Sequence, residues 1–488
     1  MLTSQPRLPY QTDRENFSVT DSFLSPDRLF DAEPTARGIA RELYAGIGDL
    51  PLLSPHGHTD PRWYAENDHF PDPSQLLIVP DHYIFRMLLS QGVRLEDLGV
   101  PTADGGAVEA DGRAIWRIFA ANYHLFRGTP TRLWIDHTFE TLFGIAERLT
   151  PANADTQYDR IAELLQHDDY RPRALYERFG LEAISTTDSA IDDLSWHKMI
   201  RDSGWTGRVL PAYRPDAVVD PDFGGFAANL DTLGEMSGCD TGRWQGYLDA
   251  HRNRRAYFIA MGATASDHGH PTAETADLGA AEAEALFDAV RSGRADAGQR
   301  ALFRAQMLTE MAKMSRDDGL VLQIHPGSLR NHSPKMMTRF GRDKGFDIPT
   351  RTDYVRALKP LLDAVGLEKD LTIVVFTLDE TSYARELAPL AGVYPALRLG
   401  PPWWFHDSPE GMMRFRQMAT ETAGFYNTVG FNDDTRAFPS IPARHDVARR
   451  VDCAFLARLV SEHRLDLDEA HEVAHDLAYG LAKRAYRL

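Results

Sequence analysis

The sequence has few cysteines and few positive charges, and it lacks long apolar runs. Only Cys239 and Cys453 occur among the 488 residues. They lie far apart, which argues against a disulfide framework or a cysteine metal site and fits a reducing compartment. No apolar run approaches the roughly 20 residues that span a bilayer. The polar start, MLTSQPRLPYQTDREN, contains no segment typical of a signal peptide. We therefore expect a cytoplasmic protein without a membrane partner.

The charge balance narrows the range of ligands. Lys and Arg number 53 against 71 Asp and Glu, which gives a formal net charge of −18. Phosphate backbones repel such a chain, so we expect no nucleic-acid partner. An anionic ligand would have to be held by local arginines against this overall field. The hydrophobic content of 43% is typical of a globular protein with a sizeable core.

Short apolar runs alternate with longer helix-like stretches along the chain. This alternation predicts an α/β fold in which helices cover a parallel sheet. Eight runs favour a closed (β/α)₈ barrel of the TIM type over an open doubly wound sheet. No Gly-x-Gly-x-x-Gly follows any run, which disfavours a dinucleotide-binding fold. The eight runs cover residues 49–58, 181–188, 207–216, 256–268, 320–328, 371–379, 396–405 and 428–438.

The first two runs are unusually far apart. Residues 59–180 lie between them, whereas a simple strand–helix unit needs only about 30 residues. This stretch is aromatic and helix-like, so we expect a large helical insertion after the first strand. The predicted organisation is an N-terminal segment with the first strand (1–60), a helical cap (61–178), the rest of the barrel (179–440) and closing helices (441–488).

Two histidines at the end of the first run are candidates for a metal site. Enzymes with this barrel carry their catalytic groups at the carboxyl ends of the strands. His56 and His58 are two residues apart, so on an extended strand both rings face the same side. Asp434 ends the eighth run, which neighbours the first run in a closed barrel. Two imidazoles and a carboxylate suit Zn²⁺ or a similar divalent ion and leave one position open. The alternative is a set of polar residues in a solvated loop.

A second His-x-His pair occurs in ATASDHGHP. His270 directly precedes Pro271, so we place it in a loop and outside the metal ligands. His268 ends the fourth run, where it either lines the site or serves as a structural histidine.

Other strand ends carry arginine, histidine and tryptophan. Arginines would clamp an anionic substrate, and tryptophans could stack on a sugar face. Simpler interpretations also stand: Arg214 as a loop charge, Arg436 as a partner of Asp434 alone, and the tryptophans as rim packing. The residues concerned are Arg214, His325, Arg330, Trp403, Trp404 and Arg436.

Taken together, these motifs resemble a known family. HGHTDP, DHYIFR, ISTTDSAIDDLSWH, VLPAYRPD, ASDHG, IHPGSLRN, LGPPWWFHD and DDTRAF occur in order over nearly the whole chain. The sequence resembles the uronate isomerases, which are (β/α)₈ barrels of the amidohydrolase superfamily. The resemblance implies an aldose–ketose isomerase that interconverts D-glucuronate with D-fructuronate and D-galacturonate with D-tagaturonate. The main alternative is metal-dependent hydrolysis of a sugar acid, lactone or amide. A sugar-acid binding protein without catalysis is a third possibility.

The resemblance also implies roles for particular residues. The ligands of a divalent ion, with Zn²⁺ expected, would be His56, His58 and Asp434. The catalytic group would comprise Asp434, Arg436, His82, Tyr83 and His325, with the carrier of the C2 proton left open. Substrate would be bound by Arg214, Arg330, Trp403, Trp404 and His268. The family pattern also leads us to expect a homo-oligomer and a small-molecule hexuronate as the ligand.

Two segments depart from the family pattern. HGHPT stands where a single histidine is expected, and FTLDET follows the sixth run where relatives tend to have Asn-Pro. These departures leave open the role of the 268–270 loop and the contacts at the end of the sixth strand.

Overall fold

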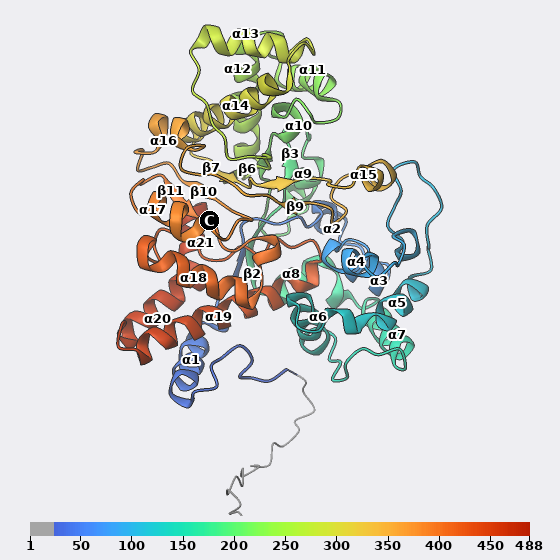
Figure 1. The fold of residues 1–488 in the computed structure, drawn as a ribbon. Coiled ribbons are helices and arrows are strands. Elements are labelled where there is room, and N and C mark those ends of the chain that lie inside the picture. The colour runs from blue at the N-terminus through green and yellow to red at the C-terminus, as the bar shows by residue number, and fades with distance from the viewer. Residues whose placement is uncertain (1–23) are drawn as a thin grey trace, which may run out of the picture.

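Parallel strands lie at the centre of the molecule with helices around them, as Figure 1 shows for the computed structural model. The structure describes residues 24–488, so the first part of the predicted N-terminal segment lies outside it. The parallel strands are β1 (Leu52–Ser54), β2 (Leu181–Ser185), β3 (Asp188–Ser189), β4 (Val209–Leu210), β5 (Tyr213–Arg214), β6 (Ala265–His268), β7 (Val321–Ile324), β10 (Ile373–Val375) and β11 (Leu397–Leu399).

The predicted runs become neighbours in their sequence order. The second run is split into β2 and β3 and the third into β4 and β5, but each half pairs in parallel with its neighbour. β1 pairs with β2, β5 with β6, β6 with β7, β7 with β10, and β10 with β11. The prediction of an α/β fold with parallel strands is confirmed.

Backbone hydrogen bonds return the last run to the first. The eighth run forms no regular strand and pairs with β11 through a single parallel bridge between Leu399 and Thr428. Beyond it, the His58 N–H donates to the Thr435 carbonyl (2.9 Å), and the Asp434 N–H donates to the His56 carbonyl (3.2 Å). The eight runs thus form a closed ring, which brings Asp434 beside the two histidines of the first run.

Helices surround this ring and provide the core with its outer layer. Leu322, Ile373 and Leu397 are fully buried beneath them. The longest helix, α14, begins with a reciprocal capping box between Asp296 and Gln299 and ends at Gly319 in the left-handed conformation. The helices outside the insertion are α1 (Pro34–Ile47), α9 (Ser195–Asp202), α10 (Asp216–Val219), α11 (Phe226–Ser237), α12 (Trp244–Ala260), α13 (Ala280–Arg291), α14 (Ala297–Asp318), α15 (Pro334–Phe340), α16 (Lys359–Val365), α17 (Ala388–Ala391), α18 (Pro409–Ala423), α19 (Ile441–Ser461), α20 (Leu467–His475) and α21 (Leu481–Tyr486).

The segment between β1 and β2 is entirely helical or irregular, as its sequence led us to expect. Its aromatic core includes Trp116, Phe119 and Phe139, and it packs against the first strands through Leu52 and Leu181. In Figure 1 it forms the blue-to-cyan group at the lower right. The division of the chain into four parts at the stated residues stays a prediction. The helices of this segment are α2 (Pro61–Glu66), α3 (Pro73–Leu77), α4 (His82–Leu89), α5 (Gly112–Ala121), α6 (Pro130–Thr141), α7 (Ala154–Leu164) and α8 (Pro172–Arg178).

The expected strand at 256–268 is wrong over its first part. Helix α12 continues through Ala260, and the strand begins only at Ala265. Phe258 is fully buried on this helix with its ring centroid 5.1 Å from that of Tyr213. A short apolar run does not distinguish a buried helix from a buried strand, and here Gly262, with φ of 101°, ends the helix before the strand starts.

Among the described residues, no helix combines the length and the apolar character needed to cross a lipid bilayer.

Candidate active site

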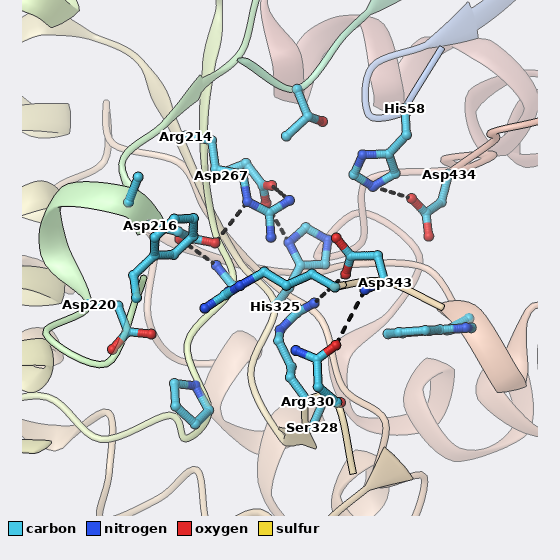
Figure 2. A pocket seen from close by; sticks show the side chains of 18 of the residues that line it. His58, Arg214, Asp216, Asp220, Asp267, His325, Ser328, Arg330, Asp343 and Asp434 are labelled. Atoms are coloured by element: carbon cyan, nitrogen blue, oxygen red, sulfur yellow. Dashed lines mark hydrogen bonds and ion pairs between the residues drawn. The ribbon is translucent and has the colours of Figure 1, made fainter. Parts of the chain in front are cut away.

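A cavity of about 540 Å³ opens at the carboxyl ends of the strands. Figure 2 shows side chains converging on it from segments far apart in the sequence. The residues come from the ends of β1, β5, β6, β7 and β11, from the eighth run, and from the start of α4. Predicted site residues that line it are His56, His58, His82, Arg214, His325, Arg330, Trp403, Trp404, Asp434 and Arg436.

Two histidines and a carboxylate converge at one wall of this cavity. Oδ1 of Asp434 lies 3.4 Å from Nε2 of His56 and 3.1 Å from Nε2 of His58. One potential ligand atom from each residue lies within 4.8 Å of the others. Nδ1 of His56 is buried and has no hydrogen-bond partner among residues 24–488. The three side chains therefore form a donor set that could hold a metal ion.

The electrostatics differ between the members of this donor set. Burial and the nearby Arg436 lower the pKa of His58 to about 4, so its ring is neutral and one ring nitrogen can bind a cation. Burial opposes protonation of His56, but Asp267 and Asp434 raise its pKa above the ordinary value. Burial opposes the charge on Asp434, but His56 and His58 together hold its pKa well below the ordinary value. The Trp403 indole N–H donates to Oδ2 of Asp434 (3.0 Å) and fixes the carboxylate. Asp434 itself has a φ of 45°, a strained conformation of the kind that often marks a functional site.

A second cluster adjoins the first through His56. Nδ1 of His325 lies 2.6 Å from Oδ1 of Asp267, and the His56 and His325 rings stack with centroids 4.5 Å apart. Ligand atoms of His56, Asp267 and His325 also converge within 4.8 Å. However, Nη1 of Arg214 lies 3.0 Å from Oδ2 of Asp267. The guanidinium would repel a second cation bound here. This cluster is therefore better suited to orienting His56, a member of the first donor set.

Two arginines approach each other beside Gly269. A Cβ atom at Gly269 would lie 2.5 Å from Nη2 of Arg214 and 2.9 Å from Nη2 of Arg330. Arg214 also contacts Oδ2 of Asp216 through Nε (2.8 Å), while Arg330 contacts Asp347 (3.2 Å). Neither arginine has all five of its N–H groups engaged, so both retain donors for a ligand. The absence of a side chain at Gly269 is what allows the two guanidinium groups to converge.

The start of α4 brings a histidine and a tyrosine to the site. Oδ1 of Asp81 accepts the Tyr83 N–H (2.8 Å) as the N-cap of this helix. Burial lowers the pKa of His82 well below its ordinary value, and neither ring nitrogen has a hydrogen-bond partner in the described chain. Burial likewise raises the pKa of Tyr83, whose hydroxyl is also unpaired. Both groups are neutral, and the Tyr83 ring stacks behind His82 at 4.6 Å.

Arginine and tryptophan complete the wall. Nε of Arg436 is buried without a partner within residues 24–488, so the guanidinium keeps donors for a ligand. Trp404 has a φ of 54°, which is unusual for a bulky residue and points to local strain. Its ring meets His82 edge to face at 5.4 Å.

Two predicted residues lie off the cavity surface. His268 is fully buried, and its neighbours Asp267 and Gly269 line the cavity in its place. Successive side chains of a strand point to opposite faces, so Asp267 takes the inner face and His268 the outer one. Tyr83 lies behind His82. His270 belongs to neither convergent cluster.

Several contributors received no role from the sequence. Asp267 was identified only as a strand-end residue in the motif ASDHG, which also contains Gly269, and Asp216 follows Arg214 in the motif RPD, so strand-end position was an available signal for all three. Asp343 and Asp347 lie in an irregular loop, where no local pattern marks them.

Comparisons with known proteins agree over almost the entire chain. The family model described as glucuronate isomerase matches residues 29–486. A uronate isomerase of Mesorhizobium japonicum is 75% identical over 467 residues, covering 96% of this chain and 100% of the relative. The crystal structure of a glucuronate isomerase from Caulobacter crescentus is 59% identical with a TM-score of 0.94, covering 95% of this chain and 97% of that one. A uronate isomerase structure from Thermotoga maritima is 26% identical with a TM-score of 0.88, over 95% and 99% of the two chains.

Proposed function

The chain belongs to the glucuronate isomerase family, the uronate isomerases, and from this premise we propose that the cavity in Figure 2 is where it interconverts aldouronates and ketouronates. The enzyme is an aldose–ketose isomerase. The observation that carries the assignment of the site is that a metal-type donor set and four arginines line one cavity. Such a cavity can hold a sugar acid by its carboxylate while its carbonyl end reaches the donor set.

The metal assigned to this site is a divalent ion, Zn²⁺, held by His56, His58 and Asp434. Two imidazoles and one carboxylate match the ligands Zn²⁺ takes in enzymes that keep a position open. Bound there, the ion would supply Lewis-acid polarisation of the substrate carbonyl. The His325–Asp267 pair packs against His56 and would keep its ring in orientation.

The substrate carboxylate binds between Arg214 and Arg330, which line the same cavity. Their convergence at Gly269 provides donors from two directions, which suits a planar carboxylate. Because the protein as a whole is strongly acidic, these short-range contacts supply the attraction that the overall field does not. Trp403 and Trp404 line the space between the two ends and exclude water from it.

Isomerisation moves one proton from C2 to C1 and a second between the oxygens. Asp434, held ionised, takes the proton from C2, and the electron pair of the broken C–H bond forms the C1=C2 bond of an enediolate. Arg436 stabilises the developing negative oxygen. Delivery of a proton to C1 and loss of the O2 proton then give the ketose. His82, neutral and without a hydrogen-bond partner among residues 24–488, supplies and accepts the protons on oxygen, and the Tyr83 ring stacked behind it holds the imidazole in place.

The test follows the C2 proton directly. Purified enzyme is incubated with D-glucuronate, and separately with D-galacturonate, in D₂O, and C2 and C1 are followed by NMR. We expect the ketose to form. We also expect deuterium from the solvent, either at C1 of the ketose after proton transfer or, by slow exchange, at C2 of the aldose. No ketose and no exchange with either substrate would exclude the proposed reaction.

Hydrolysis is the rival reaction for a barrel of this type, and the family comparisons do not favour it. If the enzyme hydrolysed a sugar lactone or amide and isomerised no hexuronate, hydrolysis would be the favoured function. Assembly into a homo-oligomer and a cytoplasmic location stay predictions.

A further inference from the structure

Asp343 is a cavity carboxylate that the proposed reaction leaves without a role. It lies in the loop between the short antiparallel strands β8 (Ser328–Leu329) and β9 (Ile348–Pro349) and lines the same cavity (Figure 2). About half of its side chain, 49%, is exposed. The nearest counter-ion is Nη1 of Arg330 at 3.9 Å. Within residues 24–488, neither of its carboxylate oxygens accepts a hydrogen bond.

The other carboxylates around the cavity are already engaged. Each of them has at least two partners within the protein at short distance. Asp343 is the one in this group whose acceptors face the cavity unused. The engaged carboxylates are Asp216 with Arg214 and the Gly269 N–H, Asp220 with Arg304 and the Asp222 N–H, Asp222 with Arg300 and Arg304, Asp267 with Arg214 and His325, Asp434 with His56, His58 and Trp403, and nearby Asp347 with Arg330 and the Asn331 N–H.

The charges around Asp343 determine what it can bind. Burial alone would raise its pKa, but Arg436, Arg330 and Arg214 lower the pKa below its ordinary value. The carboxylate is therefore ionised, and an ionised carboxylate only accepts hydrogen bonds. It repels the carboxylate of a sugar acid but suits its hydroxyl groups, whose O–H donors gain from a charged acceptor.

The loop holds Asp343 in place before any ligand binds. Asp343 has a φ of 60°, and its N–H donates to Oδ1 of Asn331 (3.3 Å), whose own N–H donates to Asp347 (2.6 Å). Next to it, the Arg342 guanidinium stacks over the Phe223 ring at 4.1 Å, which ties this loop to the segment between α10 and α11. A strained residue that its surroundings fix in this way is typical of a binding site.

We propose that Asp343 is a substrate-binding residue that accepts hydrogen bonds from hydroxyl groups of the hexuronate carbon chain. It would act between the arginines that hold the carboxylate and the donor set where the carbonyl reacts. It is thus a specificity residue, which favours a fully hydroxylated sugar acid over a deoxygenated acid of the same charge. The inference rests on the proposed function of the cavity.

The experiment compares substrates as well as variants. We would measure kcat and KM of the holoenzyme, of Asp343→Ala and of Asp343→Asn with D-glucuronate and its 3-deoxy, 4-deoxy and 5-deoxy analogues. Asp317→Asn is the charge-matched control, since Asp317 is an exposed residue outside the cavity. We expect Asp343→Ala to lower kcat/KM for D-glucuronate about 10- to 100-fold, mostly through KM, with a smaller loss for Asp343→Asn. At least one deoxy analogue should be a poor substrate of the wild type. For that analogue, Asp343→Ala should lower kcat/KM only slightly further.

Each outcome bears on the assignment. The metal content and thermal unfolding of the variants should match those of the wild type. If Asp343→Ala differs from the wild type in either, the isosteric Asp343→Asn alone decides. We then expect Asp343→Asn to lose at least about fivefold in kcat/KM. An effect below twofold, or deoxy penalties that are unchanged in the variants, would overturn the proposal. A KM for D-glucuronate that is lower in the variants than in the wild type would also overturn the proposal, because it would mean that Asp343 occupies the place of the substrate carboxylate. A wild type that converts no hexuronate would refute the proposed function itself, and this assignment with it.

Discussion

The two His-x-His segments of this chain have the same pattern at two strand ends, yet the structure gives them different surroundings. His56 and His58 face Asp434 across the cavity wall. His268 is buried away from the cavity, with Nε2 3.3 Å from the Ser266 hydroxyl and Nδ1 unpaired among the described residues. The first pair follows the strand that closes the ring with the eighth run, and the second does not. A histidine pair becomes a candidate metal site only where the topology supplies a carboxylate.

Removing a histidine of the first pair should have the largest effect. His58→Ala takes away one of the three proposed metal ligands, so we expect bound metal to fall far below one equivalent and kcat/KM to drop at least about 10³-fold. Elemental analysis and steady-state kinetics measure both. His270→Ala is the control from the second pair and should keep its metal. A His58→Ala protein with a full metal complement would remove the basis of the comparison.

Loss of Arg214 should come next. Arg214→Met removes a proposed donor to the substrate carboxylate and leaves Asp216 and Asp267 without their guanidinium. We expect a loss of about 2–4 kcal/mol in kcat/KM with metal content unchanged. Arg208→Met, at an exposed arginine that pairs with Glu182, is the control. Near-normal kcat/KM in Arg214→Met would mean that the substrate carboxylate binds elsewhere.

The glycines inside the two pairs offer a matched test. A Cβ at Gly269 would lie within 3 Å of Arg214, Asp216 and Arg330, whereas a Cβ at Gly57 would meet nothing closer than the Ser54 hydroxyl at 3.5 Å. Gly269→Ala should therefore displace the two arginines and lower kcat/KM about tenfold, mainly through KM. Gly57→Ala should stay within about threefold. Equal effects of the two substitutions would show that the arginines adjust without cost.

The smallest effect is expected from a substitution of His268 in the second pair. This substitution should change how the free energy of unfolding depends on pH. Burial lowers the pKa of His268 to about 3, so the folded protein keeps this ring neutral. The unfolded chain binds a proton there near pH 6.5, which means that the contribution of His268 to stability is present above that pH and is lost as the pH falls toward 3. His268→Asn should make the free energy of unfolding less dependent on pH in this window, by up to about 1.4 kcal/mol per pH unit.

Denaturant unfolding of the wild type and His268→Asn at pH 7 and pH 5 measures this difference, and kcat at pH 7 should change little. Parallel pH profiles of the two proteins would show that His268 is protonated in the folded state as well.

The helical insertion was predictable from the sequence, whereas the loop that carries Asp343 was not. The alternation of apolar runs with helix-like stretches is a local property, and it predicted the α/β fold and the helical segment between the first two strands. The same pattern placed the end of α12 in a strand, because local periodicity does not separate a short buried helix from a strand. In the candidate site, position at a strand end identified most residues in advance, whereas the family resemblance supplied His82 and Tyr83 at the start of α4.

The residues that sequence analysis missed depend on contacts between distant segments. Gly269 matters because Arg214 and Arg330 meet beside it, and neither arginine is near it in the chain. Asp343 lies in an irregular loop held by Asn331 and by Arg342 over Phe223. No period or spacing marks such a position, since its role arises only when three loops come together.

The sequence alone therefore determined the elements, their order, and which polar groups stand at the ends of strands, because hydrophobic periodicity and chain order act locally. Tertiary structure decided which of those groups face one another. It brought Asp434 to the first histidine pair, turned His268 away from the cavity by strand alternation, and set an unpartnered carboxylate among three arginines. Those outcomes depend on ring closure and loop packing, in which burial and charge are balanced across the whole fold.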